Sequence, residues 1–401
     1  MRASAASDLR PWTGLAVFYA ASFAVLGVYM QFFPVWLHDV RGLDKEQVTI
    51  VLAAQTIART LAGPLWAQRV DRTGRPARML RGLAWAACGG LLLFTLGSSL
   101  WWLWTCAFVF GLCYSPMHPI LDAHALQCAS RHGFAYGRVR MIGSLSFLVV
   151  ILAVGQALEH TPATLVFTLL AIGLALTGTA AFGLPRGDGV PAAPGERAPL
   201  GALLRSGPFA LLLAAAALIQ GSHATYYNLS TLHWADHGIG KGTAAVLWAE
   251  GIVAEIALFW LARGWFDRLR PTTLLLIGGA GAVVRWLVIG ATVSVPLLLA
   301  VNWLHALSFA CTYLGSMRAL ERRTAPHQRA TAQGLLGAAT SGVGMVAAAL
   351  LGGWVYERWG DRAFFVMAAF AALGVGLAFW LRRQADRAQA PAATTANASP
   401  E

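Results

Sequence analysis

Charged residues are scarce in this sequence, and their scarcity excludes the ordinary soluble classes. Only 12% of the 401 residues are charged, whereas 57% are hydrophobic and 16 are Trp. A mean hydropathy of +0.59 leaves too little polar surface to cover a water-soluble particle of this size. We therefore expect lipid to be the solvent of most of the chain.

Cysteine is also rare, and the motifs of several other classes are missing. The five cysteines have no CxxC spacing, so neither a zinc site nor a disulfide framework is predicted. No nucleophile stands at a plausible spacing from a base, and no cofactor loop is apparent, which argues against an enzyme and against a cofactor. The net charge of +12 is not gathered on a soluble face with aromatics between the charges, so nucleic acid is not an expected partner.

The sequence is instead rich in apolar stretches, each long enough to cross a hydrocarbon core of roughly 30 Å. A run of this length near the N-terminus is too long for a signal peptide and is expected to be retained. The predicted fold class is an all-α membrane protein with twelve spans, at 12–37, 47–68, 82–99, 101–127, 139–158, 162–184, 208–234, 243–262, 272–292, 296–317, 331–355 and 362–381.

Basic residues mark one side of the predicted membrane protein. Most Lys and Arg lie in the two tails and in alternate loops, and only Arg41, Lys45, Lys241, Arg358 and Arg362 lie on the other side. The positive-inside rule then predicts that both termini are cytoplasmic. We expect an integral protein of the bacterial inner membrane.

Composition divides the chain into two halves of six helices. The segment 185–207 is rich in Pro, Gly and Ala and lacks apolar periodicity, so it is predicted to be a cytoplasmic linker. It separates an N-terminal half, 1–184, from a C-terminal half, 208–382. The tail 383–401 is expected to be disordered for the same compositional reasons.

A faint internal duplication supports this division. Arg59 precedes an Asp-Arg pair by twelve residues, and Glu255 precedes a second Asp-Arg pair by twelve residues. Two parallel repeats of this kind bind substrate between the halves, near the midplane of the membrane. Ionisable groups inside membrane spans are costly, so each is a hypothesis about substrate or proton handling.

The loop after the second span carries the first family signature. Asp71-Arg72-Thr73-Gly74-Arg75 resembles the D-R-x-G-R motif of the major facilitator superfamily. Charges at a helix end can hold neighbouring helices together in one conformation and release them in another. We therefore predict a gating role for Asp71, Arg72 and Arg75, with Arg59 as a further gating residue; the alternative is that these arginines only fix topology.

A second signature extends from the fourth span into the fifth. Tyr136-Gly137-Arg138-Val139-Arg140-Met141-Ile142-Gly143-Ser144, with Asp122 before it, resembles the lactose permease family of proton symporters. The resemblance implies that Asp122 and Arg140 bind substrate and that Asp122 contributes to proton coupling. It also implies that Phe147 occupies the place of an aromatic residue that stacks on sugar.

The resemblance continues in the second half, where it implies that Glu250 and Arg285 bind substrate and that Glu250 and His305 couple it to protons. The carboxylate that the family carries one turn beyond the histidine is replaced by Ser308. Glu250 and Glu255 lie about 140° apart on a helix, so only one can face the cavity. The resemblance favours Glu250, which leaves Glu255 for a gating or coupling pair.

Other segments resemble the phenylpropionate permease family over nearly the whole chain. They are Gln220 to Tyr227, Leu247 to Glu250, Arg285-Trp286 and Leu304-His305. This likeness implies an aromatic carboxylate as substrate. His223 with Tyr226 and Tyr227 on the seventh span are candidates to line the pocket, but an aromatic cluster on a membrane helix is also commonly packing, so both interpretations stay open.

One arrangement of metal-binding residue types is present but is not predicted to bind metal. His118, Asp122 and His124 form an H-x₃-D-x-H pattern. Pro119 deforms that turn, and no further ligand cluster is evident in the sequence, so no metal is expected.

These observations predict a proton-coupled symporter that imports a small organic solute by alternating access. A carboxylate in a partly dehydrated cavity takes up a proton more readily, and a nearby Arg opposes this until substrate diverts it. The alternatives are a proton antiporter that exports drugs or metabolites, and a sugar or nucleoside symporter. The expected partners are the substrate, protons and membrane lipids, with a monomer as the functional unit.

Overall fold

The structure is a computed structural model, and it describes residues 4–186, 203–261, 264–325 and 328–389. The described residues form helices and contain no strand, which confirms the predicted fold class. Eleven helical stretches are long and apolar enough to cross a membrane. The remaining predicted span, 243–262, is α11, whose last residue adjoins a segment outside the described ranges.

The N-terminal half contains the first six spans. Helix α2 begins with a capping box, in which the Asp44 carboxylate accepts from the backbone N–H of Gln47, and it ends at Gly74 in the left-handed conformation. The elements are α1 (Ser4–Asp39), α2 (Lys45–Thr73), α3 (Pro76–Leu92), η1 (Leu93–Leu96), α4 (Leu100–Tyr114), α5 (Met117–His132), α6 (Tyr136–Ala157), α7 (Thr164–Ala180) and η2 (Ala181–Gly183).

The C-terminal half contains the other six spans and more helix interruptions. Its elements are α9 (Gly207–Gly221), α10 (Ala224–Asp236), α11 (Lys241–Leu261), α12 (Trp265–Arg268), α13 (Pro271–Ala291), α14 (Val295–Asn302), η3 (Ala306–Cys311), α15 (Thr312–Glu321), α16 (Arg329–Gly337), η5 (Ala338–Gly344), α17 (Met345–Trp359) and α18 (Arg362–Gln389). Both η3 and η5 are π-helical, a conformation that interrupts the regular hydrogen-bond ladder.

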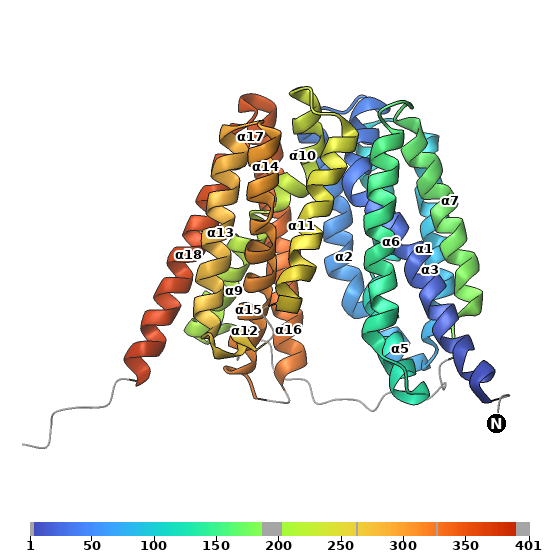
Figure 1. The fold of residues 1–401 in the computed structure, drawn as a ribbon, viewed down its shortest axis with the longest axis horizontal. Coiled ribbons are helices and arrows are strands. Elements are labelled where there is room, and N and C mark those ends of the chain that lie inside the picture. The colour runs from blue at the N-terminus through green and yellow to red at the C-terminus, as the bar shows by residue number, and fades with distance from the viewer. Residues whose placement is uncertain (1–3, 187–202, 262–263, 326–327, 390–401) are drawn as a thin grey trace, which may run out of the picture.

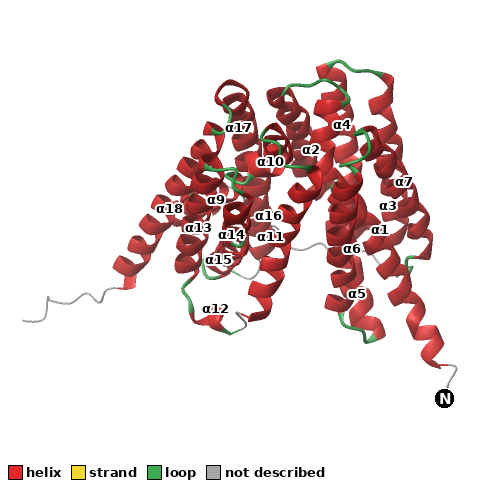
Figure 2. Ribbon diagram, turned by 45° about the horizontal axis from the view of Figure 1, so that its top comes forward, coloured by secondary structure: helices red, strands yellow, loops and turns green. Residues whose placement is uncertain are grey.

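The two halves stand side by side, with the N-terminal half in blue to green and the C-terminal half in yellow to red (Figure 1). The N-terminal end of α1 and the C-terminal end of α18 lie at the same face of the molecule, which we call the inner face (Figures 1 and 2). Helix α18 continues to Gln389, so the part of the tail up to that residue is helical rather than disordered. Residues 390–401, and linker residues 187–202, lie outside the described ranges.

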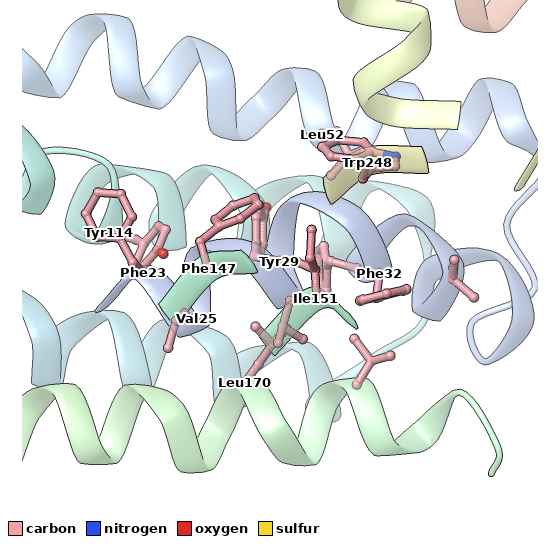
Figure 3. Packing of buried hydrophobic residues seen from close by; sticks show 14 of the residues in the cluster. Phe23, Val25, Tyr29, Phe32, Leu52, Tyr114, Phe147, Ile151, Leu170 and Trp248 are labelled. Atoms are coloured by element: carbon pink, nitrogen blue, oxygen red, sulfur yellow. The ribbon is translucent and has the colours of Figure 1, made fainter. Parts of the chain in front are cut away.

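Aromatic rings fill the core of the N-terminal half. Tyr29 stacks on Phe33 and on Phe110 at centroid distances of 4.7 and 5.1 Å, and Trp36 stacks on Phe167 at 5.0 Å. Figure 3 shows part of the buried cluster from close by, with Tyr29 among the side chains of the N-terminal half and Trp248 of α11 beside Leu52. Ring pairs of this kind add about 1 kcal/mol each beyond their buried area, so this half is tightly held.

Charged side chains join the two halves at the outer face, opposite the termini. Each pair takes one residue from α1 or α2 and one from the C-terminal half. The outer ion-pair cluster consists of Lys45 with Asp236 at 2.8 Å, Lys241 with Asp39 at 3.2 Å, and Arg358 with Glu46 at 2.7 Å. Three of the five basic residues that the charge pattern assigned to this side therefore have carboxylate partners across the interface.

Glycines bring the helices of the two halves close together near the same face. A Cβ on Gly155 of α6 would overlap the side chain of Ala245 on α11. A Cβ on Gly353 of α17 would overlap the side chain of Thr49 on α2. Since small residues permit such close helix contact in membranes, the halves are packed together at the outer face.

Candidate functional site

A cavity of about 420 Å³ lies between the two halves. It is bordered mainly by aromatic and aliphatic side chains, with a few ionisable groups among them, as is typical of small-molecule sites. The lining residues are Leu26, Tyr29, Met30, Leu52, Gln55, Thr56, Arg59 and Phe147 from the N-terminal half, and Tyr226, Tyr227, Asn228, Trp248, Gly251, Ile252, Glu255, Arg285, His305, Phe309, Ser341 and Met345 from the C-terminal half.

Arg285 borders the cavity and is itself fully buried. Its guanidinium donates to the Oδ1 of Asn302 from Nε at 3.3 Å and from Nη2 at 3.1 Å. It also lies over the rings of Tyr226 and Trp286, at 4.1 and 4.7 Å from their centroids. All of these partners are neutral, so the charge of Arg285 is solvated but not compensated.

His305 connects Arg285 to a carboxylate. The Nη1 of Arg285 donates to Nδ1 of His305 at 3.0 Å, and because a guanidinium has no acceptor, Nδ1 must carry the lone pair. The neutral imidazole then carries its proton on Nε2, which lies 3.9 Å from Oε2 of Glu255. Arg285, His305 and Glu255 thus form a chain that ends at the cavity.

Arg59 contributes a second cation to the cavity. Its Nη2 donates to the backbone carbonyl of Ser341 on η5, at 2.7 Å, so the bond joins the two halves. Within the described residues Arg59 forms no ion pair, and its side chain is exposed to the cavity. Arg59 therefore borders the cavity, and the gating role that the sequence analysis assigned to it stays a prediction.

Asp122 and Arg140 lie together, as the family resemblance predicted, at an Nε to Oδ1 distance of 3.6 Å. The same carboxylate oxygen accepts from the hydroxyls of Tyr19 at 2.5 Å and Tyr136 at 3.0 Å. We call these four residues the N-half polar cluster. Asp122 and Arg140 are not among the cavity-lining residues.

Glu250 does not line the cavity, which corrects the prediction based on the family resemblance. The face of α11 that borders the cavity consists of Trp248, Gly251, Ile252 and Glu255, at the three- and four-residue spacing of one helix face. Glu250 lies off this face, and its Oε2 is buried without a hydrogen-bond partner. Glu255 is the carboxylate that the helix presents to the cavity.

His223 is not among the cavity-lining residues, but its ring packs behind two of them, Tyr227 and His305. Its ring is fully buried, with Nδ1 donating to the carbonyl of Ile219 at 3.2 Å and Nε2 accepting from the hydroxyl of Ser308 at 3.0 Å. The break between α9 and α10 turns this ring into the helix bundle. Ser308, which replaces the family carboxylate, therefore has a structural partner, while the predicted pocket residues Tyr226 and Phe147 do border the cavity.

The predicted gating residues Asp71, Arg72 and Arg75 lie exposed at the inner end of α2. Asp71 forms no ion pair within the described part of the chain. Between described residues, the ion pairs that join the halves are those at the outer face. Asp71 of the D-R-x-G-R motif is thus without an ion pair to any described residue in this conformation, in which the outer face is closed.

The H-x₃-D-x-H pattern does not form a common site in this structure. The Nε2 of His124 donates to the carbonyl of Pro185 at 2.9 Å, and the ring of His118 packs edge-on against Phe23. Asp122 is engaged by its tyrosines. Each residue of the pattern therefore has a different environment.

Sequence reasoning missed several residues of the site. Asn302 is the neutral partner of Arg285, and nothing in its sequence context distinguishes it from an interfacial asparagine. Tyr19 reaches Asp122 from α1, which is distant in sequence. Trp248 lines the cavity and could have been found from the spacing of aromatics on its helix.

The long apolar helices, the two halves and the polar cavity between them define an integral membrane transporter. The chain belongs to the MFS_1 like family, whose model matches residues 12–367. It is 30% identical over 362 residues to the probable 3-phenylpropionic acid transporter of Escherichia coli strain K12, with 89% of this chain and 94% of that protein covered.

Two further comparisons agree with this assignment. The chain is 28% identical over 362 residues to maltose permease of Geobacillus stearothermophilus, with 88% of this chain and 90% of that protein covered. Its fold matches a crystal structure of a mutant of the nucleoside transporter NupG with a TM-score of 0.82 at 14% identity, covering 93% of this chain and 99% of that chain. The transport function predicted from the sequence is confirmed, and these relatives are transporters rather than enzymes.

Proposed function

We propose that this protein is a proton-coupled symporter that imports a small aromatic carboxylate across the bacterial inner membrane. The observation that carries the proposal is the chain from Arg285 through His305 to Glu255 at the wall of the aromatic cavity. It offers a cation for the substrate and a carboxylate for the proton, joined by an imidazole.

The charges of the cavity favour an anionic substrate. Arg59 and Arg285 both border the cavity, and neither has a carboxylate at ion-pair distance among the described residues. Glu255 is the one lining carboxylate in that part of the chain. A substrate carboxylate would compensate a buried guanidinium and accept from it through two parallel hydrogen bonds.

The remaining lining favours an aromatic body on that substrate. Rings of Tyr29, Phe147, Tyr226, Tyr227 and Trp248 surround the cavity, and aromatic pairs prefer offset or edge-on packing that such a wall can provide. A relative that covers most of this chain is named for 3-phenylpropionic acid, which has this combination of ring and carboxylate. We propose the same substrate class here.

Coupling follows from the hydrogen bonds of His305. While Arg285 donates to Nδ1, that nitrogen cannot take up a proton, so the imidazole keeps only the proton on Nε2 and stays neutral. A substrate carboxylate that draws Arg285 toward the cavity frees Nδ1 and lets His305 and Glu255 share an incoming proton. Substrate and proton are then bound together and released together.

Alternating access would use the contacts at the two faces. In the present conformation the outer ion-pair cluster holds the outer face closed. In the opposite conformation, Asp71 with Arg72 and Arg75 would close the inner face, which we place in the cytoplasm together with both termini. A single chain contains both halves, so we propose a monomer embedded in lipid as the functional unit.

The test is uptake of radiolabelled 3-phenylpropionate into proteoliposomes with and without an imposed pH gradient, acidic outside. Accumulation that depends on the gradient is expected, and it should be lost in Glu255→Gln while exchange of substrate across the membrane persists. Uptake that is driven only by the opposite gradient would indicate an antiporter, and uptake that ignores the gradient would refute coupling.

Glu250→Gln is the matched control, since Glu250 lies on the same helix but off the cavity face. The geometry predicts that this variant still accumulates substrate. If Glu250→Gln abolishes accumulation and Glu255→Gln does not, the coupling role assigned to Glu255 is wrong. Maltose and a nucleoside serve as solute controls, because a sugar or nucleoside symporter would prefer them.

A further inference from the structure

Two histidines and an aspartate lie together at the outer face, away from the cavity. His233 is on α10, His237 follows one turn later just beyond the end of that helix, and Asp361 lies in the turn between α17 and α18. The ligand atoms of the three residues are all within 4.8 Å of one another. The transport function does not use them.

The hydrogen bonds of His237 fix which ring nitrogen faces the carboxylate. Its Nδ1 lies 2.8 Å from the backbone carbonyl of His233, and since a carbonyl only accepts, Nδ1 carries the proton of the neutral ring. The lone pair is then on Nε2, which lies 3.5 Å from Oδ2 of Asp361. In the neutral ring a lone pair therefore faces a carboxylate oxygen, and either a proton on Nε2 or a bound metal ion would stabilise this arrangement.

His233 provides the second nitrogen. Its Nδ1 lies 3.3 Å from Oδ1 of Asp361 and 3.0 Å from the hydroxyl of Tyr356. The ring is fully buried, and its Nε2 has no hydrogen-bond partner. Packing therefore holds this imidazole in place with one nitrogen directed at the carboxylate. His237 and Asp361 are partly exposed, so the cluster can be reached from the outer solution.

The spacing of these atoms matches the coordination of a small transition-metal ion. Ligands at about 2.0–2.1 Å from a tetrahedral Zn²⁺ are separated by about 3.4 Å from each other. The distance from Nδ1 of His233 to Oδ1 of Asp361 is 3.3 Å, and the distance from Nε2 of His237 to Oδ2 of Asp361 is 3.5 Å, both close to this separation. The three ligand atoms all lie within 4.8 Å of one another, so a small closure of the cluster would complete the coordination. The Nδ1–H of His237 bound to a carbonyl is also the outer hydrogen bond that orients a metal-binding histidine.

We propose that His233, His237 and Asp361 form an outer-face site for a divalent transition-metal ion of the zinc class, with the fourth position open to solvent. Two imidazoles and one carboxylate suit Zn²⁺, whereas Mg²⁺ and Ca²⁺ prefer sets of oxygen ligands. The site is distinct from the sequence pattern around Asp122, and it lies beside the outer ion-pair cluster through Asp236.

The test is a titration of the purified full-length protein with Zn²⁺. Binding is measured by isothermal titration calorimetry at about pH 7.5, where free imidazoles are neutral. The protein carries an affinity tag without histidine and is first treated with a chelator that is then removed. His237→Ala and Asp361→Asn remove one ligand each at partly exposed positions. His160→Ala is the matched control, an exposed histidine in the outer loop between α6 and α7.

We expect saturable binding of one Zn²⁺ per chain in the parent and in His160→Ala, and a loss of affinity of at least about tenfold in His237→Ala and Asp361→Asn. Zn²⁺ should raise the melting temperature of the parent and the control, and Mg²⁺ should not. Absence of saturable Zn²⁺ binding, or equal affinity in the parent and both ligand variants, would overturn the site. The melting temperature without metal shows whether each variant is folded.

Discussion

Removing the carboxylates of the outer ion-pair cluster should open the outer face. The variant Asp39→Asn/Glu46→Gln/Asp236→Asn leaves all three basic partners without a carboxylate across the interface. The side chains are 17 to 42% exposed, so each pair is partly screened by solvent. Exposed pairs contribute about 0.5 kcal/mol each, which makes the combined effect about 1.5 kcal/mol and the shift toward the outward-open state about tenfold.

The measurement is the distance between spin labels at Thr161 and Val293, which lie in outer loops of the two halves. The five native cysteines are first replaced, and the labels are attached to cysteines at these two positions. The triple variant should populate a longer distance than the parent. Raising the salt concentration should move the parent in the same direction, because ions screen exposed charge pairs.

The inner-face pair Arg270 with Asp386 provides the control, since it joins elements of one half only. Asp386→Asn also replaces a carboxylate by a neutral amide, and it should leave the distance between the two spin labels at the outer face unaltered. If the triple variant and high salt both leave the distance distribution of the parent unchanged, the closure of the outer face does not depend on these ion pairs and our reasoning is refuted.

Three further predictions concern the interface, the cavity and the bundle. Gly353→Val should wedge α2 from α17 and reduce uptake severalfold, whereas Gly376→Ala, where a Cβ meets nothing within 4 Å, should leave uptake intact. Asn302→Asp should give Arg285 a carboxylate partner that competes with an anionic substrate. The KM for 3-phenylpropionate should then rise by about tenfold or more while the protein still folds. An unchanged KM would count against Arg285 as the cation that binds the substrate. Trp286→Phe should cost about 1 kcal/mol of stability through the loss of a buried indole-to-hydroxyl hydrogen bond, seen as a lower melting temperature, and an unaltered melting temperature would contradict this.

The fold could be predicted well from the sequence because lipid imposes a simple rule on it. In lipid, the backbone N–H and C=O groups of each apolar stretch must form hydrogen bonds within the stretch, which requires a helix. Length and hydropathy were therefore sufficient to predict the spans. Exact ends were less predictable. Helix α18 runs to Gln389 because an Arg-rich, Ala-rich sequence can continue a helix beyond the apolar part, which composition alone did not reveal.

The site was predictable where residues are neighbours on adjoining helices and less so where a helix face had to be chosen. Asp122 and Arg140 meet near a short loop, so their pairing follows from the motif. The choice between Glu250 and Glu255 depends on how α11 is rotated, and packing against both halves sets that rotation. His223 lies behind the lining residues because α9 ends just before it, an interruption that the apolar pattern does not mark.

The two halves differ in how their helices are interrupted. This difference affects which half changes its backbone conformation during transport. Ring pairs in the N-terminal half join α1 to α4 and α7, whereas the π-helical segments η3 and η5 interrupt the regular backbone hydrogen bonds of two spans in the C-terminal half. Irregular turns exchange their amide hydrogens sooner than regular ones under the same conditions. The transport cycle should therefore proceed by flexing of one half against a stiffer partner, and not by the equal rocking of two identical bodies.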